Sequence, residues 1–196
     1  MKYYILKNRE MPWGDYGDIL FSGLLTVMDD DYNDIDIHEI ERTGSYIPEI
    51  YRANSTNLVL SENVKNVLLK NSITGVDKFH NTIFKKIVNI DWKSWNQKDE
   101  DPAFFPETGE PIDYIEDGED DTNLHNELSV FYSVKIKEAT IDLIKSENYI
   151  YKLESPIDID LFIPNNMNRI IVSDKFKKVI ESEGIDTLKF IEIQTS

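Results

Sequence analysis

The feature that most constrains the fold is a stretch of sequence that recurs at a fixed offset of 112 residues. Residues 57–68 align without gaps on residues 169–180. Each copy has a short apolar run, then a serine and an acid, and then apolar residues at helical spacing. This order is typical of a strand followed by a helix whose first turn is capped by the serine hydroxyl. The sequence therefore predicts the same strand-to-helix turn twice, with Ser61 and Ser173 as N-caps.

The two copies share residue identities as well as a pattern. The identical pairs are Ser61 and Ser173, Lys65 and Lys177, Val67 and Val179, and Ile73 and Ile185. Strand–helix–strand units are common enough to arise independently, but identities at equal spacing favour an internal duplication. We therefore predict an α+β fold with a mixed sheet and two related strand–helix–strand units, at about residues 57–90 and 157–194.

The rest of the chain has weaker local signals. Residues 1–7 and 19–28 are apolar runs typical of strands, and residues 13–18 are typical of a turn-rich loop. With 196 residues, the chain is expected to form a single globular domain, 1–196. A second reading has two similar lobes, about 1–98 and 122–196, joined by an acidic loop at 99–121.

Composition excludes several classes of protein. The chain is 40% hydrophobic and 11% aromatic, which is too apolar for intrinsic disorder. It contains no cysteine, so disulfides, thiolate metal sites and cysteine nucleophiles are excluded. There is no apolar run long enough to span a membrane, and the apolar start is too short for a signal peptide. We therefore expect a cytoplasmic protein without membrane contact.

The negative charge is concentrated in two segments. The net charge is −16, from 37 acids and 21 Lys and Arg residues. Residues 29–41 hold seven acids and residues 99–121 hold eleven, with no Lys or Arg in either. The remaining 160 residues carry a net charge of +2. A chain of this charge is repelled by phosphates, so direct binding of nucleic acid is not expected.

Both acidic segments also contain large apolar side chains. Carboxylates that attract a partner and rings that anchor it are the two components of an electrostatically steered protein interface. A solvated acidic loop is the alternative. Trp92 and Trp95, just before the second segment, fit either core packing or an exposed anchor. The candidate partner-binding residues are Asp29, Asp31, Tyr32, Asp34, Asp36, Phe104, Phe105, Tyr114, Asp117, Glu119, Asp120 and Asp121.

Catalytic and metal-binding motifs are missing from the sequence. His38, His80 and His125 have no metal-ligand spacing, and we expect each to lie at the surface or to cap a helix. Nucleophile elbows and glycine-rich phosphate loops are absent. The run that begins at Asp29 starts like a calcium loop but has Asp34 where that loop needs glycine. We therefore predict no catalytic residue, no metal and no cofactor.

The second copy of the repeat resembles a known family. Asp160-Leu161-Phe162, the run Val172–Lys177, and Gly184-Ile185 followed by Leu188 and Phe190 are similar to the "immunity protein eleven" family of bacterial polymorphic toxin systems. The tyrosine-rich start of the chain is also similar to many members. Ile163 stands where arginine usually follows the phenylalanine in that family. The resemblance implies a non-enzymatic protein that binds a cognate toxin in the cytosol of the producing cell.

Three functions therefore compete at this point. The first is an immunity protein that neutralises a basic protein toxin, and it is favoured by the resemblance and by the acidic segments. The second is a small acidic hydrolase that uses Asp or Glu. The third is an acidic adaptor or nucleic-acid mimic that inhibits a DNA-binding protein. A toxin gene adjacent to this one would favour the first function over the third. The sequence predicts no oligomeric state.

Overall fold

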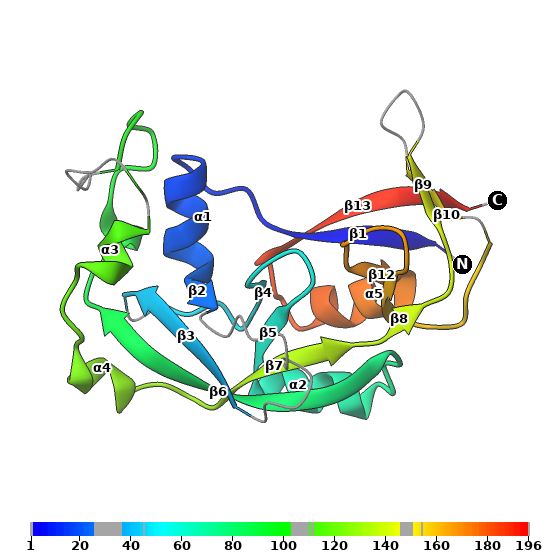
Figure 1. Ribbon diagram of the computed structural model, residues 1–196, viewed down its shortest axis with the longest axis horizontal. Helices are drawn as coiled ribbons and strands as arrows, with labels where there is room; N and C mark the ends of the chain where they lie inside the picture. Colours follow the sequence, from blue (N-terminus) through cyan, green and yellow to red (C-terminus); the bar gives the residue numbers. More distant parts are fainter. Residues whose placement is uncertain are drawn as a thin grey trace. The chain divides into compact units, whose positions relative to one another are not determined.

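The computed structural model divides the chain into two compact units (Figure 1). Unit 1 comprises Met1–Arg9, Glu49–Phe79 and Tyr132–Ser196, and unit 2 comprises Glu10–Pro48 and His80–Phe131. The units interleave along the chain, and so they differ from the two consecutive lobes considered above. The residues described are 2–25, 37–44, 46–102, 110, 112–145, 151–153 and 155–195.

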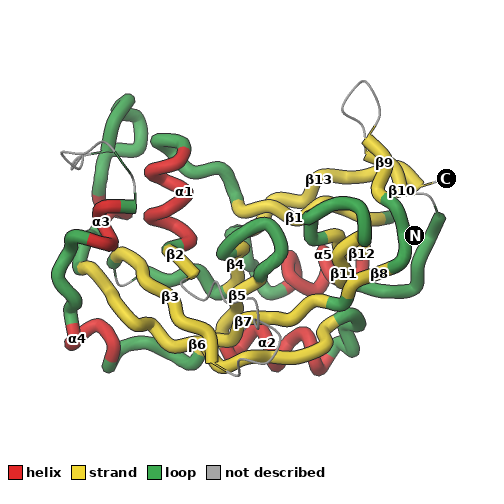
Figure 2. The backbone as a smooth tube through the Cα atoms, in the orientation of Figure 1, coloured by secondary structure: helices red, strands yellow, loops and turns green. Residues whose placement is uncertain are grey.

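Unit 1 contains a seven-stranded mixed sheet in the order β8-β11-β12-β1-β13-β10-β9 (Figure 2). At its centre β1 is antiparallel to both of its neighbours, whereas β10 is parallel to β13 and β8 is parallel to β11. The strands are β1 (Tyr3–Asn8), β8 (Glu138–Ala139), β9 (Leu143–Lys145), β10 (Tyr151–Leu153), β11 (Leu161–Pro164), β12 (Ile171–Ser173) and β13 (Leu188–Thr195).

The second sheet is also mixed, and each unit holds part of it. In unit 1 its order is β6-β7-β5-β4, and in unit 2 it is β2-β3-β6. Its strands are β2 (Leu24–Leu25), β3 (Ile37–Thr43), β4 (Ile50–Arg52), β5 (Leu58–Ser61), β6 (Val76–Val88) and β7 (Phe131–Ile136).

Helices occur in both units. Unit 1 has α2 (Glu62–Lys70) and α5 (Asp174–Ser182), and unit 2 has α1 (Asp15–Ser22), α3 (Asp113–Glu116), α4 (Thr122–His125) and the 3₁₀ turn η1 (Trp92–Ser94). The predicted α+β class with two related strand–helix–strand units is confirmed.

The duplicated turn has the same local structure in both copies. Ser61 and Ser173 have extended backbones, and their hydroxyls accept hydrogen bonds from the N–H groups of Val64 and Phe176. Each helix has nine residues and is followed by one residue with positive φ, Ser72 at 50° and Gly184 at 72°. The local sequence thus specifies both the start and the end of the repeated helix.

The strand that precedes each copy in the chain lies in the sheet of the other copy, and we call these two strands, β1 and β7, the exchanged strands. In the first copy β4, β5, α2 and β6 follow β1 in the chain, and in the second copy β11, β12, α5 and β13 follow β7. However, β1 lies between β12 and β13, whereas β7 lies between β5 and β6. Both exchanged strands carry a Tyr-x-x-Lys pattern, at Tyr4 and Tyr132. Unit 1 is therefore a tandem repeat in which each copy completes the sheet of the other.

The exchanged tyrosines make matching contacts with the repeated helices. In each copy the tyrosine ring packs edge-on against a phenylalanine, its hydroxyl reaches the first acid of the helix, and a lysine of the helix lies over its ring. In the second copy the Tyr4 ring centre lies 6.1 Å from that of Phe190, its hydroxyl lies 3.3 Å from the Asp174 carboxylate, and the Lys177 ammonium lies 4.9 Å from its ring centre. In the first copy the corresponding distances from Tyr132 are 6.2 Å to the Phe79 ring centre, 3.5 Å to the Glu62 carboxylate and 3.6 Å to the Lys65 ammonium.

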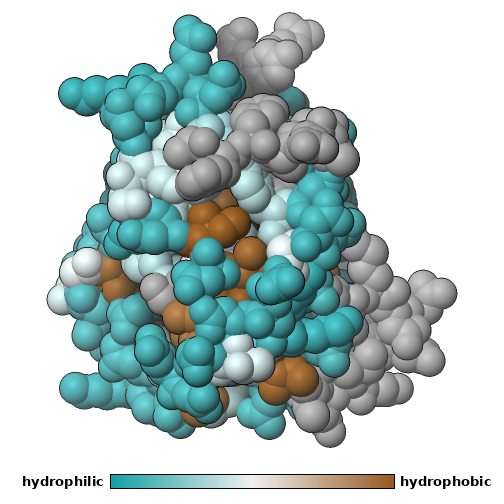
Figure 3. All heavy atoms as spheres, turned by 90° about the vertical axis from the view of Figure 1, so that its left-hand side faces the viewer, coloured by the Kyte–Doolittle hydropathy of each residue, from teal (hydrophilic) through white to brown (hydrophobic). Residues whose placement is uncertain are grey.

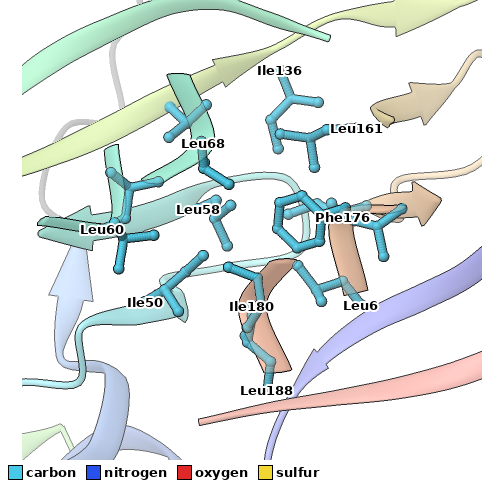
Figure 4. Packing of buried hydrophobic residues seen from close by; sticks show 14 of the residues in the cluster. Leu6, Ile50, Leu58, Leu60, Leu68, Ile136, Leu161, Phe176, Ile180 and Leu188 are labelled. Carbon is cyan, nitrogen blue, oxygen red and sulfur yellow. The ribbon is translucent and has the colours of Figure 1, made fainter. Parts of the chain in front are cut away.

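The core of unit 1 lies on both faces of β1. Tyr4 and Leu6 point into a cluster formed by both copies, in which the buried face of α2 meets that of α5 (Figure 4). Tyr3 and Ile5 point into a second cluster on the opposite face. This alternation is the period of two that a strand buried on both faces requires.

The strand predicted at residues 19–28 is wrong for residues 19–22 and correct for Leu24–Leu25, which form β2, whereas residues 26–28 lie outside the described residues. Residues 15–22 form helix α1, which also takes up part of the predicted turn at 13–18. Gly17, Leu20 and Phe21 are buried at spacings of three and four, and Asp15 and Asp18 lie in the first turn, where acids favour a helix. The apolar run begins at residue 19, in the middle of the helix, so the helical spacing of the buried residues could not be recognised from that run alone.

A network around Asp160 joins the second copy to the loop after α2. The Asp160 carboxylate accepts hydrogen bonds from the Ser173 hydroxyl at 2.6 Å, the Thr74 backbone N–H at 3.0 Å and the Lys175 ammonium at 3.2 Å. Burial acts to raise the pKa of Asp160, but these donors outweigh it and hold the pKa below its usual value.

We expect Ser61→Ala to cost about 1 kcal/mol of unfolding free energy, the usual value of an N-cap. Ser173→Ala is expected to cost about 1–3 kcal/mol more, because it also removes a donor from the buried Asp160 carboxylate. Urea unfolding measures both losses. Ser182→Ala, at an exposed position near the end of α5, is the control and should change stability by less than about 0.5 kcal/mol. Equal losses for the two caps would contradict the role assigned to Asp160.

Candidate functional site

The division of the molecule into units separates its charge. Unit 2 contains 23 acids and five Lys and Arg residues, a net charge of −18. Unit 1 contains 14 acids and 16 Lys and Arg residues, a net charge of +2. The duplicated scaffold is thus almost neutral, and the whole acidity of the chain belongs to the other unit.

The few cations of unit 2 are largely engaged in structural contacts. Arg42 is fully buried and donates to the carbonyls of Phe21 and Tyr46. Lys85 lies within 3.6 Å of carboxylates on β3, Lys86 donates to the Glu116 carbonyl, and Lys93 lies 3.7 Å from the centre of the Tyr46 ring. The fifth cation is Lys98. Five cations cannot balance 23 carboxylates, so unit 2 presents a large negative charge to its surroundings.

The described end of the second acidic segment is fastened to β6. Asp120 accepts a hydrogen bond from the Ile87 N–H at 2.8 Å and pairs with His125 at 2.8 Å. Asp121 caps α4 at the N–H of Asn123 and accepts a bond from the Asn89 side chain. These contacts give residues 112–125 a defined structure and differ from the solvated acidic loop considered above.

The sequence-predicted site residues therefore divide into four groups. Asp117 and Glu119 are exposed, and Asp120 and Asp121 bind other parts of unit 2. Tyr114 is half-buried, with its hydroxyl inside the unit. The remaining candidates lie outside the described residues, and they are Asp29, Asp31, Tyr32, Asp34, Asp36, Phe104 and Phe105.

Tyr114 belongs to a cluster of four aromatic rings within unit 2. Its ring lies 6.2 Å from that of Tyr16 and 6.3 Å from that of Trp95, and Trp95 lies 5.7 Å from Trp13. We call these four residues the aromatic cluster. Each is half-buried, so the cluster reaches the surface. By contrast Trp92 is 1% exposed and packs against Tyr46, which makes it a core residue.

Burial and nearby carboxylates set the acidity of the cluster. Burial, followed by the nearby Tyr16 hydroxyl, raises the pKa of Tyr114 to about 12. Desolvation raises the pKa of Tyr16, and the carboxylates of Glu110, Asp113 and Asp101 raise it further. The rings are therefore bordered by negative charge. On the face drawn in Figure 3, hydrophilic residues surround small hydrophobic patches.

Sequence reasoning missed the first half of this cluster. Trp13 and Tyr16 lay in what was predicted to be a turn, and nothing local links them to Trp95 or Tyr114. The available signal was the composition of Trp13–Asp18, which alternates rings and acids as the second acidic segment does.

Two histidines are buried, contrary to the prediction that all three lie at the surface or cap helices. His38 on β3 and His80 on β6 are each 1% exposed, and their rings stack at 4.4 Å. His125 is part of the short helix α4 and pairs with Asp120. Among the described residues, no group of three or more His, Asp or Glu side chains could hold a metal ion.

Comparisons of the sequence with models of known protein families and with curated proteins find no match. The resemblance to the immunity family thus stays a prediction. Within the part of the chain that the structure describes, no helix has both the length and the apolarity to cross a membrane.

The contacts of Asp120 predict a pH effect. The hydrogen bond with His125, followed by that from the Ile87 N–H, lowers the pKa of Asp120 below its ordinary 3.8. Because the folded pKa is depressed, the stabilisation is complete above about pH 4 and is lost as the pH falls through the folded value. We expect hydrogen-exchange protection of the Ile87 amide to drop over that range. Asp120→Ala should show low protection already at pH 5, and an unchanged pH profile in this variant would contradict the assignment.

Proposed function

We propose that the protein is a non-enzymatic immunity protein whose unit 2 binds and neutralises a basic toxin domain. The observation that carries the proposal is the confinement of the acidity, −18, to a unit separate from the nearly neutral scaffold. Toxins that act on nucleic acids carry basic surfaces because their substrates are phosphates. A folded acidic unit can occupy the place of such a substrate.

The proposed mechanism is rapid capture followed by steric block. Clustered carboxylates raise the association rate of a basic partner above the unsteered value of roughly 10⁵–10⁶ M⁻¹s⁻¹. The exposed Asp117 and Glu119 contribute to this attraction, while Asp120 and Asp121 hold the segment on β6. Unit 1 serves as the rigid support. No bond in the toxin is made or broken in this scheme.

If a gene adjacent to this one encodes a basic toxin domain, co-expression with that domain tests the proposal. We expect the protein to restore growth of cells that express the toxin and to co-purify with it as a stable complex. Loss of toxicity without a complex would favour an enzymatic function instead. Growth arrest in the presence of the folded protein would overturn the proposal.

Neutralising two exposed acids should slow capture of this toxin. For Asp117→Asn combined with Glu119→Gln, we expect the association rate at low ionic strength to fall about threefold or more, and the difference to shrink in high salt. Asp77→Asn combined with Glu183→Gln removes the same charge from exposed positions of unit 1 and is the matched control. Stopped-flow binding measures the rates. Equal rates for the two double variants would reject unit 2 as the binding surface.

A further inference from the structure

We propose that the aromatic cluster of Trp13, Tyr16, Trp95 and Tyr114 is an anchor site for one arginine side chain of the partner. This inference rests on the proposed function and assigns a specific contact to it. It concerns only described residues of unit 2, and it goes beyond charge attraction because it commits to one side-chain chemistry.

The geometry of the cluster suits a planar cation. Its four rings form a continuous chain of contacts 5.7–6.3 Å apart, with interplanar angles of 51–80°. The faces therefore point in different directions, and each ring remains partly exposed. A cation within about 6 Å of a ring centre is attracted by the negative face of the ring.

Carboxylates stand on the same short elements as the rings. Asp15 precedes Tyr16 in the first turn of α1, and Asp113 precedes Tyr114 in α3. The carboxylates of Glu110, Asp113 and Asp101 raise the pKa of the Tyr16 hydroxyl. A guanidinium group can stack on an aromatic face and pair with a carboxylate in the same plane, which an ammonium group cannot do. The combination of rings and carboxylates therefore selects arginine over lysine.

The protein itself contains close contacts between a lysine ammonium and a tyrosine ring. The Lys93 ammonium lies 3.7 Å from the centre of the Tyr46 ring in unit 2, and Lys65 lies 3.6 Å from that of Tyr132 in unit 1. These contacts show that tyrosine faces of this protein accommodate cations at close range.

The test uses the full-length protein and a nine-residue Gly/Ser peptide with one arginine. The indole N–H signals of Trp13, Trp92 and Trp95 are followed by NMR as peptide is added. We expect the signals of Trp13 and Trp95 to shift and that of the core residue Trp92 to stay. The same peptide with citrulline, which keeps the shape and lacks the charge, should produce no shift, and a lysine peptide should bind more weakly.

Variants separate the anchor from general attraction. Trp95→Leu is expected to weaken binding of the arginine peptide by about 3- to 30-fold, the range of a cation–π contact. Asp113→Asn should weaken it as well, without removal of a ring, which guards against misfolding of the first variant. Asp77→Asn, in unit 1, is the matched control and should bind like the original protein. Equal binding of arginine and citrulline peptides, or an unchanged affinity in Trp95→Leu and Asp113→Asn, would overturn the anchor.

The same variants distinguish this inference from the proposed function. If the anchor is correct, Trp95→Leu speeds dissociation of the toxin complex while the charge variants of Asp117 and Glu119 slow its formation. A toxin complex whose dissociation is unaffected by Trp95→Leu would reject the anchor and leave the function standing. Absence of any complex with the toxin would reject the function itself.

Discussion

Phe176→Ala is expected to lower the free energy of unfolding by about 3–5 kcal/mol, the range for removal of a buried aromatic ring. Phe176 is fully buried on α5 and lies in the cluster where the two copies of the repeat meet (Figure 4). Its backbone N–H also donates a hydrogen bond to the Ser173 hydroxyl, which limits how far the backbone can shift to fill the cavity. The surrounding residues come from both copies, which limits collapse of the site.

Urea unfolding followed by circular dichroism measures this loss. Phe190→Ala is the matched control, because Phe190 is only partly buried and packs at the edge of the same cluster. We expect its cost to be about half that of Phe176→Ala. A cost below about 1 kcal/mol for Phe176→Ala would show that the interface between the copies does not hold unit 1 together.

Gly75→Ala should also destabilise unit 1, by about 2–5 kcal/mol. Gly75 has φ of 98°, a conformation that costs an L-residue roughly 1–2 kcal/mol. A Cβ atom there would lie 1.8 Å from the Leu161 carbonyl oxygen, so the backbone of β11 would have to move. The Gly75 carbonyl also accepts a hydrogen bond from the N–H of Lys137, the residue that follows β7. This bond fixes the position of Gly75 relative to that strand. Overpacking against backbone adds about 1–3 kcal/mol.

Gly184 offers a control with the same chemistry. Its φ is 72°, and a Cβ atom there would meet nothing within 4 Å. Gly184→Ala should therefore cost only the conformational part, about 1–2 kcal/mol. Thermal or urea unfolding of the two variants isolates the steric contribution. Similar losses for both glycines would mean that the contact between Gly75 and β11 is unimportant.

The duplicated scaffold and the acidic unit differ in how readily they could be predicted. The caps at Ser61 and Ser173 depend on contacts three residues apart, so local sequence was sufficient to predict them. The acidic character of the candidate site is likewise a property of composition. The sequence was therefore sufficient to select Asp117 and Glu119 as candidate binding residues. The structural roles of Asp120 and Asp121 could not be predicted, because they depend on contacts with β6 and the residue after it.

The sequence by itself determined the α+β class, the repeated strand-to-helix turn and the two acidic segments, because each of these follows from neighbouring residues or from composition. Only the tertiary structure decided that β1 and β7 exchange places, that His38 and His80 are buried, and that Trp13 and Tyr16 meet Trp95 and Tyr114. A strand such as β1 carries the same alternation whichever strands it joins. Its partners are chosen by the burial of apolar side chains that lie more than 150 residues apart, as with Tyr4 and Val172.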